Sequence, residues 1–433
     1  MLVQALLMAG GLAFGQPSIR NAQAVEDVQA GKITTAKAAW WGFEAEDSTR
    51  ALQAAIDSGA KKVIVPYMGS PWILTPVRLR GNQELHLEPG VVLLAKRGSF
   101  LGRGDSLLTA DGVENLLIRG YGATLRMHKA DYQKPPYDKA EWRMGLALRG
   151  VKNVRVEGLR SESSGGDGFY ISGGRTREWS EDVVVKDCVA EDNHRQGMSV
   201  ISAVNLTVEN CRFAKTGGTA PEAGLDLEPD VETERMQNVV VRNSVFEYNN
   251  GDGVLVYLRP LTGKSAPVSI RFENCVMRGG GGMGRAGIRV SAVRDDGPQG
   301  LIEFINCVTE DTGRESAGVT EKSSKNVKVR FVNCHFRNPW QSTSPTVSVP
   351  RVPIFLEVRR EEIASTVGQV EFVDCYVHDA VDRPVLRLES ETGKGLVDVQ
   401  GRIYAPSAKR GRVMLGADPV RVDVRVVAGD APR

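Results

Sequence analysis

The sequence lacks an excess of charge of either sign, and it lacks a long hydrophobic run. Its 433 residues include 55 lysines and arginines against 53 aspartates and glutamates, a net charge of +2. This balance gives no reason to expect binding to nucleic acid or to an anionic membrane surface. After the N-terminal segment, no stretch approaches the roughly 20 apolar residues of a membrane span. The sequence therefore predicts neither a nucleic-acid partner nor a transmembrane segment.

Histidine is also scarce, with 5 in the chain, and histidines and cysteines do not cluster at the spacings of zinc ligands. No glycine-rich phosphate motif follows an expected strand and opens a helix. The run GGGGMG at 279–284 has the composition of a loop. We therefore predict no metal and no cofactor, apart from the calcium alternative considered below.

Residues 1–15 read MLVQALLMAGGLAFG, a short apolar run that ends in small residues. This pattern is typical of a secretory signal peptide, although the basic residues that usually open one are missing. The alternative is a buried N-terminal helix. We predict a signal peptide over 1–15, a linker over 16–44 and one domain over 45–433, in a protein that is secreted or periplasmic.

A repeat accounts for most of the chain. Segments such as VVVKDC and IRFENC alternate apolar and polar residues, the pattern of a strand with one buried face, and then end in Asn or Asp followed by cysteine. The cysteines that end them are Cys188, Cys211, Cys275, Cys307, Cys334 and Cys375, and Ser244 ends a seventh such segment. Their spacing suits a solenoid coil of about 20–40 residues. Stacked coils would place the cysteines in one inward column as free, buried thiols. The Asn and Asp residues would form a ladder at the turn, with side chains bonding the backbone.

A second strand follows a glycine in each coil, with apolar residues at the first and third positions after it, except at Glu321. Those positions point inward, so the second and fourth point outward. The second positions are Ala147, Tyr170, Ser199, Asp226, Leu255, Arg289 and Thr320. The fourth positions are Arg149, Ser172, Ile201, Glu228, Tyr257, Ser291 and Lys322. Neighbours within each outward column should lie about 4.8 Å apart.

Upstream, Asp47 or Ser48 can cap an amphipathic helix that Gly59 ends. Together with the repeat, this arrangement resembles the pectate-lyase-like superfamily, in which a helix plugs the open end of the solenoid. The resemblance covers residues from about 45 to 430. It implies an all-β fold, a right-handed single-stranded parallel β-helix with an N-terminal capping helix, and a C-terminal cap after the last coils.

One coil, GLDLEPD, carries the strongest chemical signal. Asp226 and Glu228 point outward on one exposed strand, at residue positions about 6.6–6.8 Å apart. That separation falls near the range of about 6.5–9.5 Å for the two carboxylates of inverting glycosidases. We predict that Asp226 and Glu228 are catalytic, with His194 of the adjacent coil and Asp167 two coils away. The alternatives are a calcium site that includes Asp230 and a plain solvated polar face.

Further side chains near this coil are candidates for binding substrate. Arg195 and Gln196 offer a cation and an amide, and Tyr257, beside Glu228, can stack on a sugar ring. The remaining candidates in this group are Tyr170, Asp252 and Arg289.

The step Gly166-Asp167-Gly168 looks like the Asn-Thr-Asp-Gly step of polygalacturonases, in which the Asp is catalytic. The next coil departs from that family, because Arg195-Gln196 stand where polygalacturonases carry two Asp residues. Ala223 stands where they carry a histidine. Alginate epimerases have a Gly-Phe-Asp-Pro-His step, of which only Asp226 is kept. A standard polygalacturonase is therefore not expected.

Three functions remain open from the sequence, all with a polysaccharide or oligosaccharide as partner. The first is a glycoside hydrolase that uses Asp226 and Glu228. The second is a lyase or C5-epimerase on uronic-acid polymers, with His194 or Tyr170 as the base and Arg195 or Arg289 neutralising the carboxylate. The third is a glycan-binding β-helix without catalysis.

Overall fold

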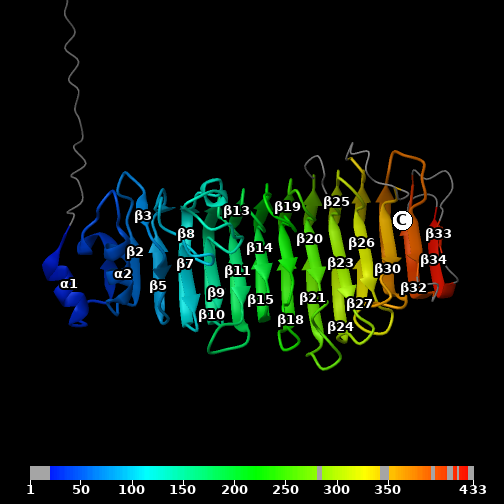
Figure 1. Ribbon diagram of the computed structural model, residues 1–433, viewed down its shortest axis with the longest axis horizontal. Coiled ribbons are helices and arrows are strands. Elements are labelled where there is room, and N and C mark those ends of the chain that lie inside the picture. Colours follow the sequence, from blue (N-terminus) through cyan, green and yellow to red (C-terminus); the bar gives the residue numbers. More distant parts are fainter. Residues whose placement is uncertain are drawn as a thin grey trace, which may run out of the picture.

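The computed structural model describes residues 20–279, 285–341, 351–391, 395–406, 413–416 and 419–427. The expected signal peptide, residues 1–15, lies outside the described residues. The chain forms one elongated solenoid whose strands stack side by side along its long axis (Figure 1). All ladders between the named strands are parallel, which confirms the predicted parallel β-helix.

Each central coil contributes three strands, one to each face of the solenoid. The first face contains β1 (Thr35–Lys37), β2 (Lys62–Val65), β5 (Gln83–Leu87), β8 (Glu114–Arg126), β10 (Lys152–Glu162), β12 (Ser180–Lys186), β15 (Ala203–Glu209), β18 (Met236–Arg242), β21 (Val268–Glu273), β24 (Gly300–Ile305), β27 (Lys328–Val332), β30 (Val367–His378), β32 (Leu396–Tyr404) and β34 (Pro419–Val427). The second contains β3 (Trp72–Leu74), β6 (Val92–Ala95), β13 (Val189–Glu191), β16 (Arg212–Ala214), β19 (Val245–Glu247), β22 (Val276–Arg278), β25 (Val308–Glu310), β28 (His335–Arg337) and the ends of the longer strands β8, β10 and β30.

The third face is a separate 12-stranded sheet, and the outward columns lie on it. Its strands are β4 (Val77–Arg78), β7 (Leu108–Asp111), β9 (Leu146–Arg149), β11 (Phe169–Ser172), β14 (Met198–Val200), β17 (Leu225–Leu227), β20 (Val254–Tyr257), β23 (Ile288–Val293), β26 (Ala317–Lys322), β29 (Ile354–Val358), β31 (Leu386–Ser390) and β33 (Val413–Leu415). We call this face the site sheet.

The repeat that ends in Asx-Cys forms the corner between the first two faces. Asn and Asp residues at this corner adopt left-handed backbone, with φ of 54° at Asp187 and 52° at Asn274, which these residues tolerate better than most. Their side chains bond one another between coils, at 3.2 Å from Asn306 to Asn274, rather than the backbone that we expected. All six cysteines are free and buried, as predicted. The column therefore fixes a corner and fills the core.

Aromatic side chains continue the core between the cysteine column and the site sheet. Phe272, Phe304, Phe331 and Phe372 stack face to face at centroid distances of 4.9, 5.1 and 5.3 Å. All four are fully buried. Because identical side chains recur at one coil position, the core of this region is a stack of flat rings.

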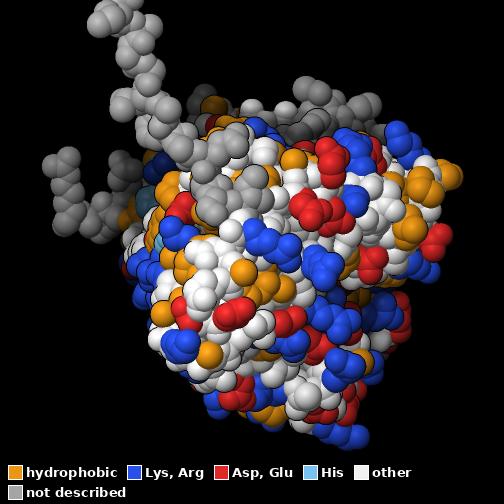
Figure 2. All heavy atoms as spheres, turned by 90° about the vertical axis from the view of Figure 1, so that its left-hand side faces the viewer, with side chains coloured by type: hydrophobic (Ala, Val, Ile, Leu, Met, Phe, Trp, Pro, Cys, Tyr) orange, Lys and Arg blue, Asp and Glu red, His pale blue; other side chains and the backbone are white. Residues whose placement is uncertain are grey.

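The N-terminal end is closed by helices, as the sequence predicted. Helix α2 (Thr49–Asp57) buries Leu52 and Ile56 against the first coils, and the Asp47 carboxylate accepts a hydrogen bond from the Thr49 amide at its start. Residues 20–44, expected as a linker, instead contain α1 (Ala22–Gln29), β1 and the short helix η1 (Ala38–Trp41), and β1 pairs with β2. Figure 2 looks onto this end, where acidic and basic side chains are interspersed around small apolar patches.

The described part of the C-terminal region consists of the strands β31 to β34, so the alternation after Pro384 was interpreted correctly as further coils. A separate C-terminal capping element is not among the described residues. A second short helix, η2 (Asp131–Gln133), lies in the long connection between β8 and β9.

The predicted register of the site sheet holds through six coils and is wrong at the seventh. Arg289 pairs with Gly318, not with Thr320, and Thr320 pairs with Ser291 in the fourth-position column. Lys322 pairs with Val293, outside the column to which we assigned it. The reason is that Ser316, rather than Gly318, occupies the position of the repeating glycine in this coil. The residue before that position is therefore Glu315 and not Ala317.

Candidate functional site

Three neighbouring strands of the site sheet build the centre of the site. Tyr170 of β11, Ser199 of β14 and Asp226 of β17 are register partners, as the glycine-based register predicted. The repeating glycines are required by close approach: a Cβ on Gly197 would lie 2.5 Å from the carbonyl oxygen of Gly224. The start of each of these strands therefore lies directly against the next coil.

The expected exposure of Asp226 is wrong. Asp226 points outward from the sheet, yet it is 0% exposed, while the Glu228 side chain is 27% exposed. Gln196 covers Asp226, because its Nε2 donates to Asp226 Oδ2 at 2.7 Å. Its Oε1 accepts from the Ala223 amide, also at 2.7 Å. Side chains from the turn before β14 therefore cover the outward face of the site sheet at this position.

Arg195 lies between carboxylates of the two coils that flank its own. Its guanidinium lies 3.2 Å from Glu228 Oε2 through one arm and 3.7 Å from Asp167 Oδ2 through the other. Burial lowers the pKa of Arg195, but the carboxylates around it, Asp167 first, outweigh burial and raise it. We call Asp167, Arg195, Asp226 and Glu228 the acid cluster. Its three carboxyl groups against one cation leave at least one carboxyl group without a compensating charge.

Burial raises the pKa of Asp226 well above its usual range, and the neighbouring Glu228 carboxylate raises it further. The two carboxyl groups are near enough for the charge of Glu228 to act on Asp226, and their predicted separation stays a prediction. Among the described residues, Asp226 Oδ1 has no donor. We call Asp226 and Glu228 the dyad, because burial and the neighbouring Glu228 carboxylate both favour the protonated form of Asp226.

Burial also raises the pKa of Asp167, to about 6, and Arg195 only partly opposes this effect. Asp167 is fully buried, on the opposite arm of Arg195 from Glu228. It therefore contacts the Arg195 guanidinium from the buried side, and its catalytic role stays a prediction.

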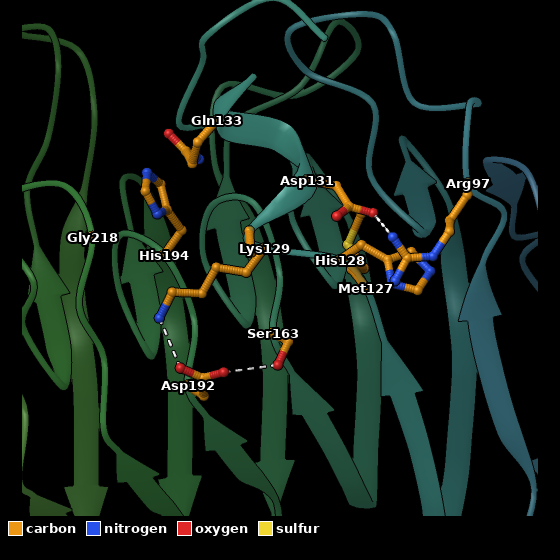
Figure 3. Close-up of a pocket in the computed structure, with 11 residues that line it drawn as sticks. Arg97, Met127, His128, Lys129, Asp131, Gln133, Ser163, Asp192, His194 and Gly218 are labelled. Carbon is orange, nitrogen blue, oxygen red and sulfur yellow. Dashed lines mark hydrogen bonds and ion pairs between the residues drawn. The ribbon is translucent and has the colours of Figure 1, made fainter. Parts of the chain in front are cut away.

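His194 does not join the acid cluster, although it precedes Arg195 in the chain. Its ring lines a separate cavity of about 660 Å³ with Lys129 and Gln133, where Figure 3 shows the imidazole turned towards Gln133. Burial lowers the pKa of His194, and Lys129 lowers it further. A Cβ on Gly218 would lie 2.1 Å from its Nδ1, so the ring packs directly on backbone. The predicted placement of His194 beside the two carboxylates is therefore wrong.

The other predicted binding residues divide between two places. The Arg149 guanidinium lies 4.8 Å from the centre of the Tyr170 ring, beside the acid cluster. Asp252, Tyr257 and Arg289 line a second groove further along the site sheet. The Arg289 guanidinium contacts Asp252 at 3.4 Å and Glu315 at 2.7 Å. Sequence reasoning missed Glu315, and the signal that could have found it was Glu321 at a position that should be apolar.

Metal binding at Asp226, Glu228 and Asp230 finds no geometric support. The described parts of the chain contain no group of three or more His, Cys, Asp or Glu side chains placed to hold a metal ion. In those same parts, no helix has both the length and the apolar character of a membrane span. Calcium dependence stays a prediction.

Comparisons with known proteins agree with this architecture. Residues 141–262 match the family model for a right-handed beta helix region. Two uncharacterised proteins of Bacillus subtilis (strain 168) are similar: YclG, 27% identical over 197 residues, and the SPbeta prophage-derived YorA, 27% identical over 221 residues. The matches cover 41% and 48% of this chain but only 33% and 36% of those relatives.

Solved structures extend the similarity over almost the whole chain. A family 28 exopolygalacturonase of Yersinia enterocolitica superposes with a TM-score of 0.60 at 15% identity, covering 93% of this chain and 79% of that one. The A-module of the mannuronan C-5 epimerase AlgE6 of Azotobacter vinelandii gives 0.61 at 14% identity, covering 92% and 99%. At such identities the likeness establishes the fold alone. The chain is a right-handed parallel β-helix protein.

Proposed function

We propose that this protein hydrolyses glycosidic bonds of a polysaccharide at the acid cluster. The observation that carries the proposal is the pair of a buried Asp226, held by Gln196 and with its pKa raised well above its usual range, and a partly exposed Glu228 that is ion-paired with Arg195. A carboxyl group that favours its protonated form next to a carboxylate can act as an acid and a base in one site. The polysaccharide-acting proteins among the similar structures, such as the exopolygalacturonase, support the substrate class.

Glu228 is the member of the dyad that solvent reaches, so it is the group that would contact the substrate. The dyad gives its proton to the glycosidic oxygen as the carbon–oxygen bond breaks and positive charge develops on the sugar ring. The incoming water then forms the new bond to that carbon and returns a proton to the dyad. Asp226 stores the proton behind Glu228, and Arg195 holds the Glu228 carboxylate in place.

Elimination or epimerisation has less support, because either reaction needs a base and a cation free to neutralise a uronate. Arg195 is already shared between Asp167 and Glu228. Burial raises the pKa of Tyr170, which makes it a poorer base at neutral pH. His194 faces another cavity. These contacts favour hydrolysis over the second function that the sequence left open.

The test is a panel of neutral and acidic polysaccharides, with reducing ends and ultraviolet absorbance followed in parallel. We expect new reducing ends without the absorbance of an unsaturated product. Glu228→Gln and Asp226→Asn should each lower the rate by about 10²–10⁴-fold, the usual contribution of acid–base catalysis. Asp182→Asn, at an outer corner where the side chain accepts a hydrogen bond from Asn205, is the matched control. Full activity in both dyad variants, or cleavage by elimination, would overturn the proposal.

A further inference from the structure

A second groove lies on the same sheet as the acid cluster, towards the C-terminus. It has a volume of about 500 Å³ and is built on β20, β23, β26 and β29. We call it the arginine groove, after the five arginines among its lining residues: Arg285, Arg289, Arg314, Arg359 and Arg360. Three carboxylates also line it, Asp252, Glu321 and Glu357. Basic side chains therefore outnumber acidic ones in this groove.

The two kinds of charge are layered by depth. The carboxylates lie underneath, with side chains 5% exposed at Asp252, 8% at Glu321 and 0% at Glu315. The guanidinium groups lie above them, and their side chains are 33% exposed at Arg314, 41% at Arg359 and 46% at Arg360. The buried carboxylates therefore hold the arginines in place, and the surface that a ligand meets is cationic.

The floor of the groove holds one arginine, Arg289, against the buried carboxylates. Arg289 lies flat across it, bonded to Glu315 at 2.7 Å and to Asp252 at 3.4 Å. The next residue in its column is Gly318, where a Cβ would come within 2.6 Å of the Arg289 guanidinium. A glycine at this column position, where neighbouring coils carry side chains, leaves the room that Arg289 occupies.

Two further features add to the positive character. Among the described residues, Arg285 forms no ion pair with a carboxylate, although its charge lowers the pKa of Asp252, so its guanidinium is open to a ligand. Burial raises the pKa of Glu357 to about 7, which leaves part of its population uncharged at neutral pH. The acid cluster has the opposite layering, with Glu228 27% exposed above an Arg195 side chain that is 14% exposed. One sheet thus presents an anionic centre and a cationic groove.

We propose that the arginine groove binds the anionic substituents of a polysaccharide chain, with the carboxylate, sulfate or phosphate oxygens held by guanidinium groups. Planar guanidinium groups bind such oxyanions through paired charge-assisted hydrogen bonds. Tyr257 lines the groove at its end nearest the acid cluster, one coil from Glu228, where its ring can stack on a sugar. Four coils separate the Glu228 and Glu357 positions, or about 19 Å at ~4.8 Å per coil. This inference rests on the proposed function for its glycan, which would run along the solenoid axis.

Binding is tested separately from cleavage, in the Glu228→Gln background. The probes are polygalacturonate, dextran sulfate and neutral dextran, with affinity measured by calorimetry at several salt concentrations. We expect at least one anionic probe to bind and neutral dextran not to bind. Arg285→Gln and Arg360→Gln should each weaken anionic binding about 10-fold and reduce its salt dependence. Arg80→Gln, an exposed arginine of the N-terminal coils, is the control.

The outcomes separate the two proposals. Equal binding by the groove variants and the control, or equal binding of neutral and anionic probes, would overturn the groove while leaving hydrolysis at the acid cluster intact. Groove-dependent binding without cleavage of any polysaccharide by the wild-type protein would remove the hydrolase and keep the groove. A preference between carboxylated and sulfated probes identifies the substituent. Because Arg285 forms no ion pair with a carboxylate in the described chain, its variant tests the idea even where Arg360→Gln weakens folding.

Discussion

Replacing Asp167 by Asn should stabilise the protein at alkaline pH and not at acid pH. Burial raises the pKa of Asp167 from 3.8 to about 6, so the folded protein holds this proton more tightly than the unfolded chain does. A raised carboxyl pKa means that stability is present below about pH 4 and is lost as the pH rises through 6. At ~1.4 kcal/mol per pH unit, the loss amounts to about 3 kcal/mol.

The Asn variant cannot titrate at this position, so its stability lacks that loss. The difference in unfolding free energy between Asp167→Asn and wild type should therefore grow by about 3 kcal/mol between pH 4 and pH 8. Urea unfolding followed by circular dichroism at a series of pH values measures it. Other titrating carboxylates are common to both proteins and cancel in the difference.

The control is Asp182→Asn, whose side chain sits at an outer corner and bonds Asn205. A difference between Asp167→Asn and wild type that stays constant from pH 4 to pH 8 would refute the reasoning. A difference that shrinks as the pH rises would refute it as well, because it would mean that Arg195 stabilises the ionised carboxylate more than burial destabilises it.

Three further changes test other parts of the molecule. Lys322 is fully buried, with its Nζ 2.7 Å from the Gly368 carbonyl oxygen, and burial lowers its pKa well below the usual range. In urea titrations, the unfolding free energy of the wild type should therefore rise between pH 7 and pH 10 relative to that of Lys322→Met, by up to ~1.4 kcal/mol per pH unit. Phe304→Ala removes a fully buried ring from the aromatic stack and should cost about 3–5 kcal/mol of unfolding free energy; a loss below ~1 kcal/mol would contradict the packing. Gly218→Ala brings a Cβ against His194 and should displace the imidazole ring towards solvent, so the pKa of His194 should rise towards its usual value in an NMR titration. An unchanged pKa of His194 in this variant would count against the contact.

The fold could be predicted from the sequence because its coils repeat the same local residue pattern. The Asx-Cys step marks a corner, since Asn and Asp accept left-handed backbone and cysteine fills a small buried space. The glycine before each strand of the site sheet marks where two coils touch. These features gave the register of Tyr170, Ser199 and Asp226 correctly.

The glycine-based register is wrong where one coil departs from the repeat. Because Ser316 takes the place of the usual glycine, the predicted register was shifted by two residues there, and Glu315 was not predicted as a site residue. His194 was misplaced for a different reason. Adjacent residues in a turn point their side chains in different directions. Only the packing of Gly218 against the His194 ring shows that this side chain points away from the acid cluster.

The sequence by itself determined the β-helix, its N-terminal helix, the inward thiol column and the strand that carries Asp226 and Glu228. Only the tertiary structure decided how deeply those carboxylates are buried and which side chains compensate their charge. Alternation along a strand sets the direction of a side chain, whereas burial depends on side chains from other coils. Gln196 covers Asp226 and Arg195 pairs with Glu228, so two carboxylates that the sequence pattern places on an exposed face are a buried acid and a partly exposed, ion-paired neighbour.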